Sequence, residues 1–563
     1  MAGWDESVDL AIVGSGGGGL VAAMATADAG LDALVIEKQP LVGGSTGLSG
    51  GMIWLPNNPL MRTQGILDSH EDGMAYLDDV VGDVGPCSSH ERREMFLRAG
   101  YEMVTFMQRS GIRLVRSDGY SDYYPNHKGG NARGRAIEGI PFASAELGEW
   151  SDKLQPGFSK GFGLVLLTNE LRDVQYFNRS IRSLGVAVKV FARTVRARLQ
   201  RQDLLTNGAS LIGQMMKVLL DQGVPVWRNS AVEELVVEGD RVVGIRVLRD
   251  GAPTTVEARR GVLLAAGGFA HNPAMRRKYS GDQPNEAEWS VANAGDTGEV
   301  LELAMSLGAR TDLLDEAWWL PNPSMELAAT GSSLTAARQR PGTVFVDGEG
   351  LRFCNESNSY VEIGKAMYAA KAVPCWLVFD DGYRRRYTHT IKPIPGRLPQ
   401  EWIDRGWVKK GSTIEELAGQ IGVDPQRLAE TIKRFNANAA KGLDPDFGRG
   451  QSAYNDCLGD PGSSNPSLGP LDTGPYYATQ IFPGDVGTCG GLLTNEYAQV
   501  LSESDQPIPG LYATGNITAT VMGRTYPGAG ASIANTTVFG FVAARHAAGR
   551  IGLDRPHRGA SSI

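Results

Sequence analysis

The sequence predicts an α/β fold in which a Rossmann-like nucleotide-binding domain carries an inserted α+β domain. Residues 8–37 read as an apolar strand, a glycine turn, an alanine-rich helix and a second apolar strand, the usual opening of such a domain. Two further apolar strands that end in glycine turns occur later in the chain, and the pattern between them changes to shorter helices and strands. We therefore expect the first domain to be interrupted and then completed near the end of the chain.

The turn between the first strand and the first helix has the glycine spacing of a dinucleotide-binding site. Gly14 permits the tight turn, Gly16 lets the backbone approach a pyrophosphate, and Gly19 lets the helix pack closely on the strand. The N-terminus of the helix favours the phosphate charge, and Glu37 ends the second strand where a ribose hydroxyl would be bound. The predicted cofactor contacts of this unit are Gly14, Gly16, Gly17, Gly18, Gly19, Glu37 and Lys38.

A second glycine-rich stretch, residues 43–51, indicates which dinucleotide is bound. Glycine serves where the main chain approaches a ligand closely, so this stretch favours a bulky flat ligand. In flavoproteins that ligand is FAD; NAD alone is the alternative, but a simple NAD enzyme does not need the extra glycine turns. The strand-and-turn segments at 261–270 and 510–516 resemble flavin-contacting strands. The further predicted FAD contacts are Gly44, Ser45, Thr46, Ser49, Gly50, Gly51, Ala266, Gly267, Gly515, Asn516, Ala531, Ser532 and Ile533. Because no histidine is placed for covalent attachment, we expect non-covalent FAD.

The remaining elements follow in order from apolar periodicity. Alternating apolar residues over 226–247 predict a strand hairpin. Helical periodicity predicts helices at 297–307 and 413–421, and a final helix near 538–550. We expect an FAD-binding domain over 1–290 with a basic insertion near 150–215, a catalytic domain over 291–475, and the rest of the FAD-binding domain over 476–563.

Charge and composition limit the partners that we expect. The 563 residues have a net charge of −8 and a pI near 5.6, which argues against nucleic acid because phosphate binding needs clustered positive charge. No run of eighteen apolar residues occurs, and the acidic N-terminus enters the first strand directly, so we expect neither a membrane span nor a signal peptide. The five cysteines lack CxxC spacing and suit a reducing compartment. The seven histidines lack metal-ligand spacing, so we expect a cytoplasmic protein without a metal.

Two motifs carry a resemblance to a known family. The segment 522–532 reads MGRTYPGAGAS, and 352–361 reads RFCNESNSYV. Together they resemble the 3-ketosteroid delta-1-dehydrogenases, within the fumarate-reductase-like flavoproteins. DYYPNHKGGNARGR at 122–135, GDTG at 295–298 and GTCGGLL at 487–493 also match. The glycine fingerprint is shared by many flavoproteins, whereas the TYPGAG and NESNSY pair is far more specific.

The resemblance implies an FAD-dependent 1,2-desaturation of 3-ketosteroids, from a 3-oxo-4-ene to a 1,4-diene. A proton leaves C2, a hydride leaves C1 for flavin N5, and an external electron acceptor reoxidises the flavin. By the same resemblance, the Tyr526 hydroxyl and the Gly530 backbone N–H bind the 3-keto oxygen. Tyr360, which closes the NESxxY pattern, is the base at C2.

A phenol with an ordinary pKa near 10 is a poor base at neutral pH, so Tyr360 needs help. The family supplies a second tyrosine from a segment that matches DYYP here, and a hydrogen bond from that phenol would stabilise phenolate character. Tyr123 is our first choice for this residue. Tyr124 remains the alternative, because the tandem pair leaves the register open.

The insertion contains a basic segment, 172–201, with Arg172, Arg179, Arg182, Lys189, Arg193, Arg196, Arg198 and Arg201 against one acid, Asp173. Val188, Phe191, Val195 and Leu199 recur between these charges at helical spacing. One interpretation is a basic amphipathic helix on the inner face of a membrane. The other is a solvated helix packed on its own domain or on a neighbouring subunit. The membrane interpretation resembles the longer enzymes of the family, which act on sterones with a side chain such as cholest-4-en-3-one.

Two rival functions share the fold. A fumarate-reductase-like enzyme would use Arg524 as a carboxylate clamp or proton donor. A delta-4-(5-alpha) ketosteroid dehydrogenase would act on another bond of the same substrate. The sequence also leaves two roles open for Asp296, a helix cap or a functional acid.

Overall fold

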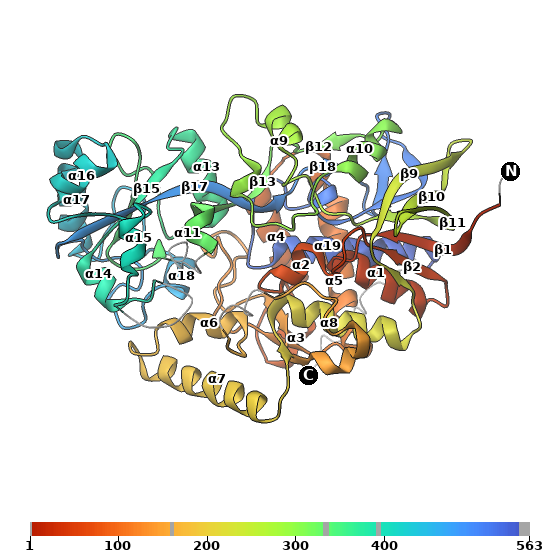
Figure 1. The fold of residues 1–563 in the computed structure, drawn as a ribbon, viewed down its shortest axis with the longest axis horizontal. Helices are drawn as coiled ribbons and strands as arrows, with labels where there is room; N and C mark the ends of the chain where they lie inside the picture. Colours follow the sequence, from red (N-terminus) through yellow and green to blue (C-terminus); the bar gives the residue numbers. More distant parts are fainter. Residues whose placement is uncertain (1–2, 158–162, 330–336, 390–395, 551–563) are drawn as a thin grey trace.

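The structure is a computed structural model of the chain, and it describes residues 3–157, 163–329, 337–389 and 396–550. Figure 1 shows an elongated molecule with one sheet near each end of its long axis. A mixed α/β fold of this kind agrees with the expected fold class.

The first sheet has eight strands and is parallel at its centre. Its main path runs β19-β20-β11-β1-β2-β8, and the hairpin β9–β10 pairs with β11. The strands are β1 Glu6–Val13, β2 Ala33–Ile36, β8 Val226–Trp227, β9 Ser230–Glu238, β10 Arg241–Arg249, β11 Ala252–Leu264, β19 Gln499–Leu501 and β20 Pro507–Ala513. The predicted strand–helix–strand opening, the hairpin and both returning strands are therefore confirmed.

Two long helices flank the centre of this sheet. Helix α1, Gly17–Asp28, is rich in alanine and glycine and is buried over most of its length, because small side chains let it lie close to β1 and to helix α19. Helix α19 spans Ala531–Ala547, so it begins seven residues before the helix that the sequence predicts. Helix α5, His90–Arg109, packs on α19 from outside.

The second sheet has five strands and is antiparallel. Its strands are β13 Ala317–Pro323, β14 Thr343–Val346, β15 Cys375–Asp380, β16 Lys409–Gly411 and β17 Tyr476–Thr488. Strand β17 pairs with β13 and β15, so this part of the chain after residue 475 belongs to the second sheet. Figure 1 shows β17 running from the second sheet toward the first.

The second sheet is covered by helices of its own. These are α11 Met325–Ala329, α13 Tyr360–Ala369, α14 Asp381–Arg386, α15 Gln400–Asp404, α16 Ile414–Ile421, α17 Pro425–Ala439 and α18 Ala453–Cys457. The predicted helix at 413–421 is confirmed as α16, with Thr413 as its N-cap. The helix predicted at 297–307 is confirmed as α10, Glu299–Ser306.

The remaining elements surround the two sheets. The smaller strands are β3 Met52–Trp54, β4 Leu114–Arg116, β5 Ala136–Gly139, β6 Phe142–Ala143, β7 Leu204–Leu205, β12 Thr311–Asp312 and β18 Gly491–Leu492. The other helices are α2 Gly44–Leu48, α3 Pro59–Thr63, α4 His70–Val81, α6 Thr168–Gln175, α7 Ile181–Leu199, α8 Asn207–Asp221 and α9 Pro273–Ser280. Short 3-10 turns lie at Pro86–Ser88, Ser144–Trp150, Ala287–Trp289 and Gly515–Ile517.

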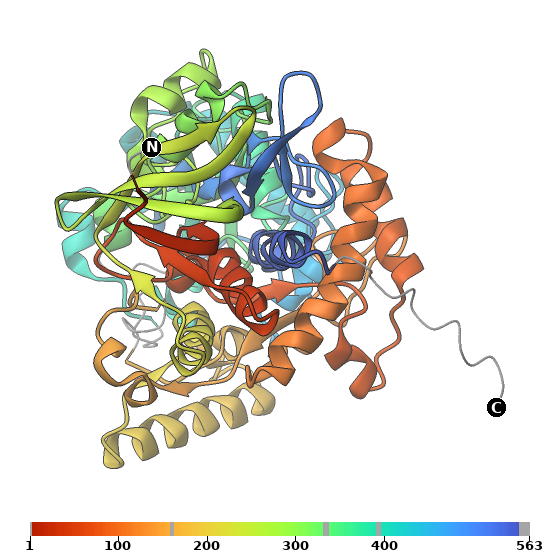
Figure 2. The ribbon, with the colours of Figure 1, turned by 90° about the vertical axis from the view of Figure 1, so that its right-hand side faces the viewer.

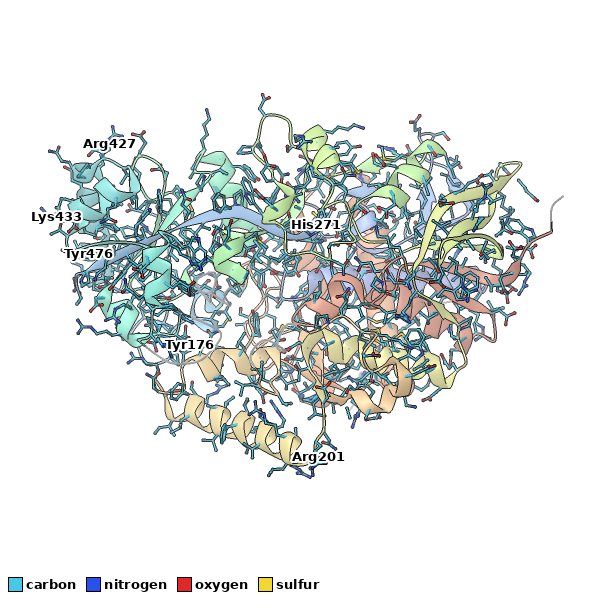
Figure 3. All side chains as sticks on the ribbon, in the orientation of Figure 1. Tyr176, Arg201, His271, Arg427, Lys433 and Tyr476 are labelled. Atoms are coloured by element: carbon cyan, nitrogen blue, oxygen red, sulfur yellow. The ribbon has the colours of Figure 1, made fainter. Side chains whose placement is uncertain are left out.

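The basic segment forms the helices α6 and α7. Figures 1 and 2 both show α7 as a long helix at the outer edge of the molecule. One side of α7 packs on α6, and α6 in turn reaches the second sheet's domain through Tyr176, whose hydroxyl donates to the Leu458 carbonyl at 3.0 Å. In Figure 3, Tyr176 and Arg201 lie at opposite ends of this pair of helices.

Candidate active site

One large cavity opens where the carboxyl ends of the central parallel strands meet the second sheet. Val13 of β1 and Ala265, directly after β11, line its first-sheet side, and Leu320 and Val486 line it from the second sheet. Ligands of open α/β sheets bind at such strand ends. The cavity is therefore the candidate active site, and both sheets contribute to it.

The fingerprint glycines have three different surroundings. Gly14 has a φ of 107°, which favours glycine. A Cβ at Gly16 would meet nothing within 4 Å, because the residue faces the cavity. A Cβ at Gly19 would lie 2.1 Å from the Gly14 carbonyl oxygen, so this position needs glycine for the contact between helix and strand.

Most of the residues predicted to contact the cofactor line this cavity. They are Gly14, Gly16, Gly17, Glu37, Lys38, Gly44, Ser45, Thr46, Ser49, Gly50, Gly51, Ala266, Gly267, Gly515, Asn516, Ser532 and Ile533. Gly18, Gly19 and Ala531 do not. A Cβ at Gly18 would lie 2.6 Å from the Thr536 carbonyl oxygen of α19, so its glycine serves helix packing, and Ala531 is buried within α19.

The glycine-rich stretch is only partly explained by a ligand. A Cβ at Gly51 would lie 2.4 Å from the Asn207 carbonyl carbon, and one at Gly50 would lie 3.1 Å from Thr168 Cγ2. These two glycines line the cavity, but their missing side chains make room for α8 and α6. Gly50 and Gly51 therefore line the cavity as expected and also permit close packing of the neighbouring helices.

Glu37 joins the two glycine segments. Its carboxylate accepts hydrogen bonds from the Ser15 amide at 3.1 Å and the Ser15 hydroxyl at 2.6 Å, and from the Gln39 amide at 2.9 Å. The Ser15 hydroxyl in turn accepts from the Gly43 amide at 3.0 Å. Ser15 also lines the cavity, and the sequence analysis missed it.

Asp296 is a second carboxylate in the cavity wall. It accepts a hydrogen bond from the Ser45 hydroxyl at 3.2 Å, and burial raises its pKa from 3.8 to about 7. The N-cap of α10 is Gly298, so Asp296 does not cap that helix. The helix-cap interpretation is therefore wrong, and Asp296 lines the cavity.

Three of the tyrosines singled out in the sequence form a cluster at the other end of the cavity. The ring centroids of Tyr123 and Tyr360 are 5.3 Å apart, those of Tyr123 and Tyr526 are 5.6 Å apart, and those of Tyr360 and Tyr526 are 5.2 Å apart. All three line the cavity. We call Tyr123, Tyr360 and Tyr526 the phenol cluster.

Tyr124 does not belong to the phenol cluster. Its hydroxyl donates to a carboxylate oxygen of Glu362 at 3.0 Å, and it does not line the cavity. Tyr123 lines the cavity, whereas the Tyr124 hydroxyl is turned toward Glu362 of α13. The geometry therefore selects Tyr123 over Tyr124.

Tyr526 and Gly530 lie at the N-terminus of α19. The Tyr526 hydroxyl is 3.1 Å from the Ser532 hydroxyl, and Trp318 packs edge-on against the Tyr526 ring at 5.1 Å. Gly530 is the N-cap of α19 with a φ of 93°, and its amide donates no hydrogen bond within the described part of the chain. Both residues line the cavity.

Burial controls the ionisation of the phenol cluster. It raises the pKa of Tyr360 well above 10, and it does the same for Tyr123. A hydrogen bond from Tyr123 acts on Tyr360 in the opposite direction, as the sequence analysis expected, but burial outweighs it. Tyr360 is consequently a protonated phenol at neutral pH.

A fourth phenol, Tyr454, was missed by the sequence analysis. Its ring centroid lies 4.4 Å from that of Tyr123, and burial raises its pKa to about 12. No motif marks this residue, because it comes from the short helix α18 in the loop region before β17. Only the folded structure brings it to the phenol cluster.

The NES part of the NESNSY motif holds Tyr360 in place. Glu356 is fully buried and pairs with Arg352 at 2.8 Å and with Arg449 at 3.0 Å. The Asn355 amide donates to Asn455 at 3.1 Å. These contacts fix the segment that leads into α13, which begins at Tyr360.

Arg524 lies outside the cavity. Its guanidinium pairs with Asp315 and Glu316, each at 2.8 Å, and it does not line the cavity wall. A carboxylate clamp would need a guanidinium that faces the substrate. The geometry therefore gives Arg524 a structural role.

Within the described residues, no group of three His, Cys, Asp or Glu side chains is close enough to hold a metal ion. His271 is half-buried and bonds to the Ala292 carbonyl at 3.1 Å. Figure 3 shows it near the middle of the molecule. All five cysteines are free, and four of them are buried. No helix in the described part of the chain combines the length and the apolar character needed to cross a membrane.

Comparison with known proteins decides the family. Residues 9–533 match the FAD binding domain family. A 3-oxosteroid 1-dehydrogenase of Mycobacterium tuberculosis is 38% identical, and the match covers 97% of this chain and 99% of that protein. The chain belongs to the 3-oxosteroid 1-dehydrogenase family. Its cofactor is FAD, and the protein is an FAD-dependent oxidoreductase.

Two further relatives refine the picture of this family member. The crystal structure of 3-ketosteroid delta1-dehydrogenase from Sterolibacterium denitrificans in complex with 1,4-androstadiene-3,17-dione superposes with a TM-score of 0.90 at 35% identity, over 97% of this chain and all of that one. A 4-oxocyclohex-2-ene-1-carboxylate 5-dehydrogenase of Sinomonas cyclohexanicum is 34% identical over 96% of this chain and 93% of that protein. The family thus includes enzymes named for a steroid and for a small keto acid.

The cavity fits FAD. Gly16 leaves open space where the fingerprint would receive a pyrophosphate, next to the N-terminus of α1. Ser532 and Ile533 in the first turn of α19 line the cavity, and a helix N-terminus carries partial positive charge.

Proposed function

We propose that this enzyme desaturates the C1–C2 bond of 3-ketosteroids and converts a 3-oxo-4-ene into a 1,4-diene. The observation that carries the proposal is the phenol cluster, which meets beside Gly530 on one wall of the cavity. Removing a proton next to a ketone requires a base and hydrogen-bond donors for the developing enolate. The cluster and the Gly530 amide offer both.

In this proposal the Tyr526 hydroxyl and the Gly530 N–H bind the 3-keto oxygen. Both groups come from the turn before α19, which positions them four residues apart. Donors that are held rigidly stabilise the enolate as charge moves onto the oxygen. The Ser532 hydroxyl at 3.1 Å orients the Tyr526 hydroxyl.

Tyr360 takes the proton from C2, and Tyr123 supports it with a hydrogen bond. The burial that raises the pKa of Tyr360 also strengthens its basicity once it is deprotonated. Bound FAD, held without a covalent bond, supplies the acceptor for the hydride that leaves C1. Gly14, Gly16 and Gly17 line the cavity and would present backbone to its pyrophosphate, and Glu37 would bind its ribose.

The cavity favours a neutral substrate over a keto acid. Lys38 is the single cationic side chain that lines it in the described part of the chain, and Lys38 is paired with Glu299. A carboxylate substrate would therefore enter without a partner for its charge, which is costly in a buried site. A neutral steroid ketone therefore suits this cavity better than 4-oxocyclohexenecarboxylate or fumarate.

The test incubates the FAD-loaded enzyme with 4-androstene-3,17-dione and an artificial electron acceptor. We expect 1,4-androstadiene-3,17-dione, identified by mass spectrometry. Tyr526→Phe should retain flavin and lose about 100- to 1000-fold in rate, because one donor to the enolate oxygen is gone. Turnover of fumarate or of a keto acid instead of the steroid would contradict the proposal. With 5α-androstane-3,17-dione, a 4-ene product would indicate the delta-4 reaction.

We also propose that α7 contacts a membrane surface. Its outward side carries an exposed apolar stripe, Ile181, Leu184, Val188, Phe191 and Leu199, beside the half-buried Val195. Ile181 is 91% exposed and Phe191 63%, and such a stripe on the outside of a helix is costly in water. Arg182, Lys189 and Arg196 follow one flank of the stripe at seven-residue spacing, as in helices that lie on anionic membranes.

The basic patch is smaller than the sequence analysis expected. Arg172 pairs with Asp173 at 3.4 Å, Arg179 with Asp460 at 3.0 Å, and Arg193 with Glu170. Arg179 thus ties the insertion to the second sheet's domain, whereas Arg172 and Arg193 pair with acids of the insertion itself. Lys189 lies 3.6 Å from Glu170, although its side chain stays 70% exposed. The other cations left for a membrane lie along α7 and at its end, where Figure 3 labels Arg201.

The membrane proposal is tested with vesicles of phosphatidylcholine alone and with added phosphatidylglycerol. We expect co-sedimentation with the anionic vesicles, and faster turnover of cholest-4-en-3-one delivered in them. Phe191→Asp should abolish binding but leave FAD content unchanged. Leu443→Asp is the matched control, since Leu443 is also exposed, at 56%, but lies outside α7. Equal binding by both variants would contradict the role of α7.

A further inference from the structure

The turn that carries the proposed ketone-binding groups, residues 526–530, is held by a side chain that does not line the cavity. Tyr76 belongs to α4, and its hydroxyl donates to the Pro527 carbonyl at 2.8 Å. The same carbonyl accepts the Tyr123 amide at 3.0 Å. The Pro527 carbonyl therefore joins this turn to the segment that carries Tyr123.

Tyr76 reaches that segment as well. Its hydroxyl accepts a hydrogen bond from the Tyr124 amide at 3.2 Å, so one oxygen atom binds both the turn and the backbone next to Tyr123. The side chain is fully buried, and Arg135 lies over its ring at 5.3 Å. Buried hydrogen bonds of this kind have little freedom to rearrange.

Trp54 supports the same turn from the other side. A Cβ at Gly528 would lie 2.2 Å from Trp54 Cδ1, so the turn rests directly on the indole ring. The Trp54 backbone N–H donates to the Gly530 carbonyl at 3.3 Å. The indole N–H donates to Asp122 at 2.7 Å, and Asp122 is paired with Arg135 at 2.8 Å. This network fixes the ring.

We propose that Tyr76, together with Trp54, is a positioning residue for the reaction. It sets the separation between the ketone donors, Tyr526 and Gly530, and the phenols that handle the C2 proton. Donors and base must act on neighbouring atoms of one substrate at the same time, so a shift of the turn slows the chemical step more than it weakens binding. This inference rests on the proposed function.

The test compares Tyr76→Phe with a matched control, Tyr368→Phe. The Tyr368 hydroxyl also donates to a proline carbonyl, that of Pro284 at 3.0 Å, but it lies outside the cavity. Steroid affinity is measured by titration of the flavin spectrum, and the chemical step by anaerobic flavin bleaching at saturating steroid. We expect Tyr76→Phe to slow bleaching by about 10- to 100-fold with steroid affinity within about threefold. Tyr368→Phe should bleach at the wild-type rate.

A double-mutant cycle separates positioning from general destabilisation. If Tyr76 acts through the turn, the factor by which Tyr76→Phe slows flavin bleaching must be at least about threefold smaller in a Tyr526→Phe background. The reason is that one of the groups that Tyr76 positions is already gone. Trp54→Phe removes the hydrogen bond to Asp122 and should likewise slow bleaching without weakening steroid affinity. If Tyr76→Phe loses its flavin, Trp54→Phe tests the positioning role in its place.

Three results would overturn the inference: wild-type bleaching in the positioning variants, an equal loss in Tyr368→Phe, or fully additive costs in the cycle. A wild-type enzyme that forms no diene, or a Tyr526→Phe variant that keeps the full rate, would instead contradict the proposed function itself.

Discussion

At the scale of single residues, the protonation of Tyr360 decides how the proposed reaction depends on pH. Burial raises its pKa well above 10, so the proton-accepting form is scarce at neutral pH. A protonated phenol cannot take a proton. The rate of the chemical step should therefore follow the small deprotonated fraction of Tyr360.

We accordingly predict that kcat rises with pH between about 7 and 10, by up to about tenfold per unit where deprotonation of Tyr360 limits the rate. Tyr360→Phe should remove both the activity and the alkaline rise. The measurement is a kcat profile with saturating steroid, with flavin absorbance as the control for intact enzyme. A flat profile, or full activity in Tyr360→Phe, would mean that another group takes the proton.

The fingerprint glycines allow a second prediction. Gly16 faces open space, so Gly16→Val should fold but exclude FAD from the pyrophosphate position. Gly19→Ala should instead destabilise the fold, by about 1–3 kcal/mol, because its Cβ would lie 2.1 Å from the Gly14 carbonyl oxygen. The ratio of flavin to protein absorbance and the apparent Tm separate the two cases. A flavin-replete Gly16→Val would argue against this placement of FAD.

The local sequence identified individual site residues, but it did not show which distant residues they contact in the folded protein. The tandem Tyr123–Tyr124 could not be resolved in the sequence, because the choice depends on which one faces a cavity built by distant segments. Tyr76 and Tyr454 were missed for the same reason, since hydrogen bonds and ring contacts across hundreds of positions leave no local pattern.

At the scale of elements, strands and helices with clear periodicity were predictable, and their ends were not. Helix α19 begins at Ala531 because Gly530 adopts a left-handed conformation as its N-cap, which a glycine-rich sequence does not reveal in advance. The helix α7 was predictable from its spacing of apolar residues. Its pairing with α6 through Arg193 and Glu170 was not, because the sequence does not show which acid a given arginine reaches in the folded protein.

The start of α6 rests on a buried carboxylate. The Glu138 side chain accepts hydrogen bonds from the backbone amides of Thr168 at 2.8 Å and Asn169 at 3.2 Å. Thr168 also lines the cavity. Burial raises the pKa of Glu138 from 4.5 to about 7. Since the folded pKa is the higher one, the stability from protonated Glu138 is fully present below pH 4.5 and is lost as the pH rises through 7.

We predict that Glu138→Gln removes the loss of folding stability that ionisation of Glu138 causes as the pH rises. The Tm of the variant relative to wild type should increase between pH 4.5 and about 7.5, by the equivalent of up to about 3 kcal/mol. Glu149→Gln is the control, because the Glu149 side chain is 83% exposed. The measurement is thermal unfolding across that pH range. A difference between Glu138→Gln and wild type that stays constant with pH would contradict the assignment.

At the scale of the whole molecule, the cavity exists because two sheets meet, and strand β17 connects them. The sequence indicated an inserted domain from a change in pattern, but it placed residues 476–488 with the first sheet. A strand's partner is set by long-range pairing, and the apolar pattern of β17 is the same whichever sheet it joins. The arrangement of the two sheets was therefore beyond local prediction.

The junction contains a buried ion pair. The Asp485 carboxylate of β17 pairs with the Arg276 guanidinium of α9 at 2.6 Å. It also accepts hydrogen bonds from the Ser290 hydroxyl at 2.6 Å and the Gly487 amide at 2.9 Å. Both charged side chains are almost fully excluded from water. Removing one charge from such a pair leaves the other buried and uncompensated, which costs about 3–5 kcal/mol.

We predict that Asp485→Asn lowers the apparent Tm of the holoenzyme strongly, whereas the double variant Arg276→Met/Asp485→Asn recovers most of the loss. The asparagine keeps an oxygen for Ser290 and Gly487 in both variants. The double variant lacks the uncompensated guanidinium, and with it the Arg276 hydrogen bonds to the Ala270 carbonyl and to Asn285. Release of flavin fluorescence on heating reports when the junction opens, because the cavity is built from both sheets. Should the double variant melt no higher than the single one, the ion pair would be holding the sheets together by its attraction, and replacement by apolar contacts would not suffice.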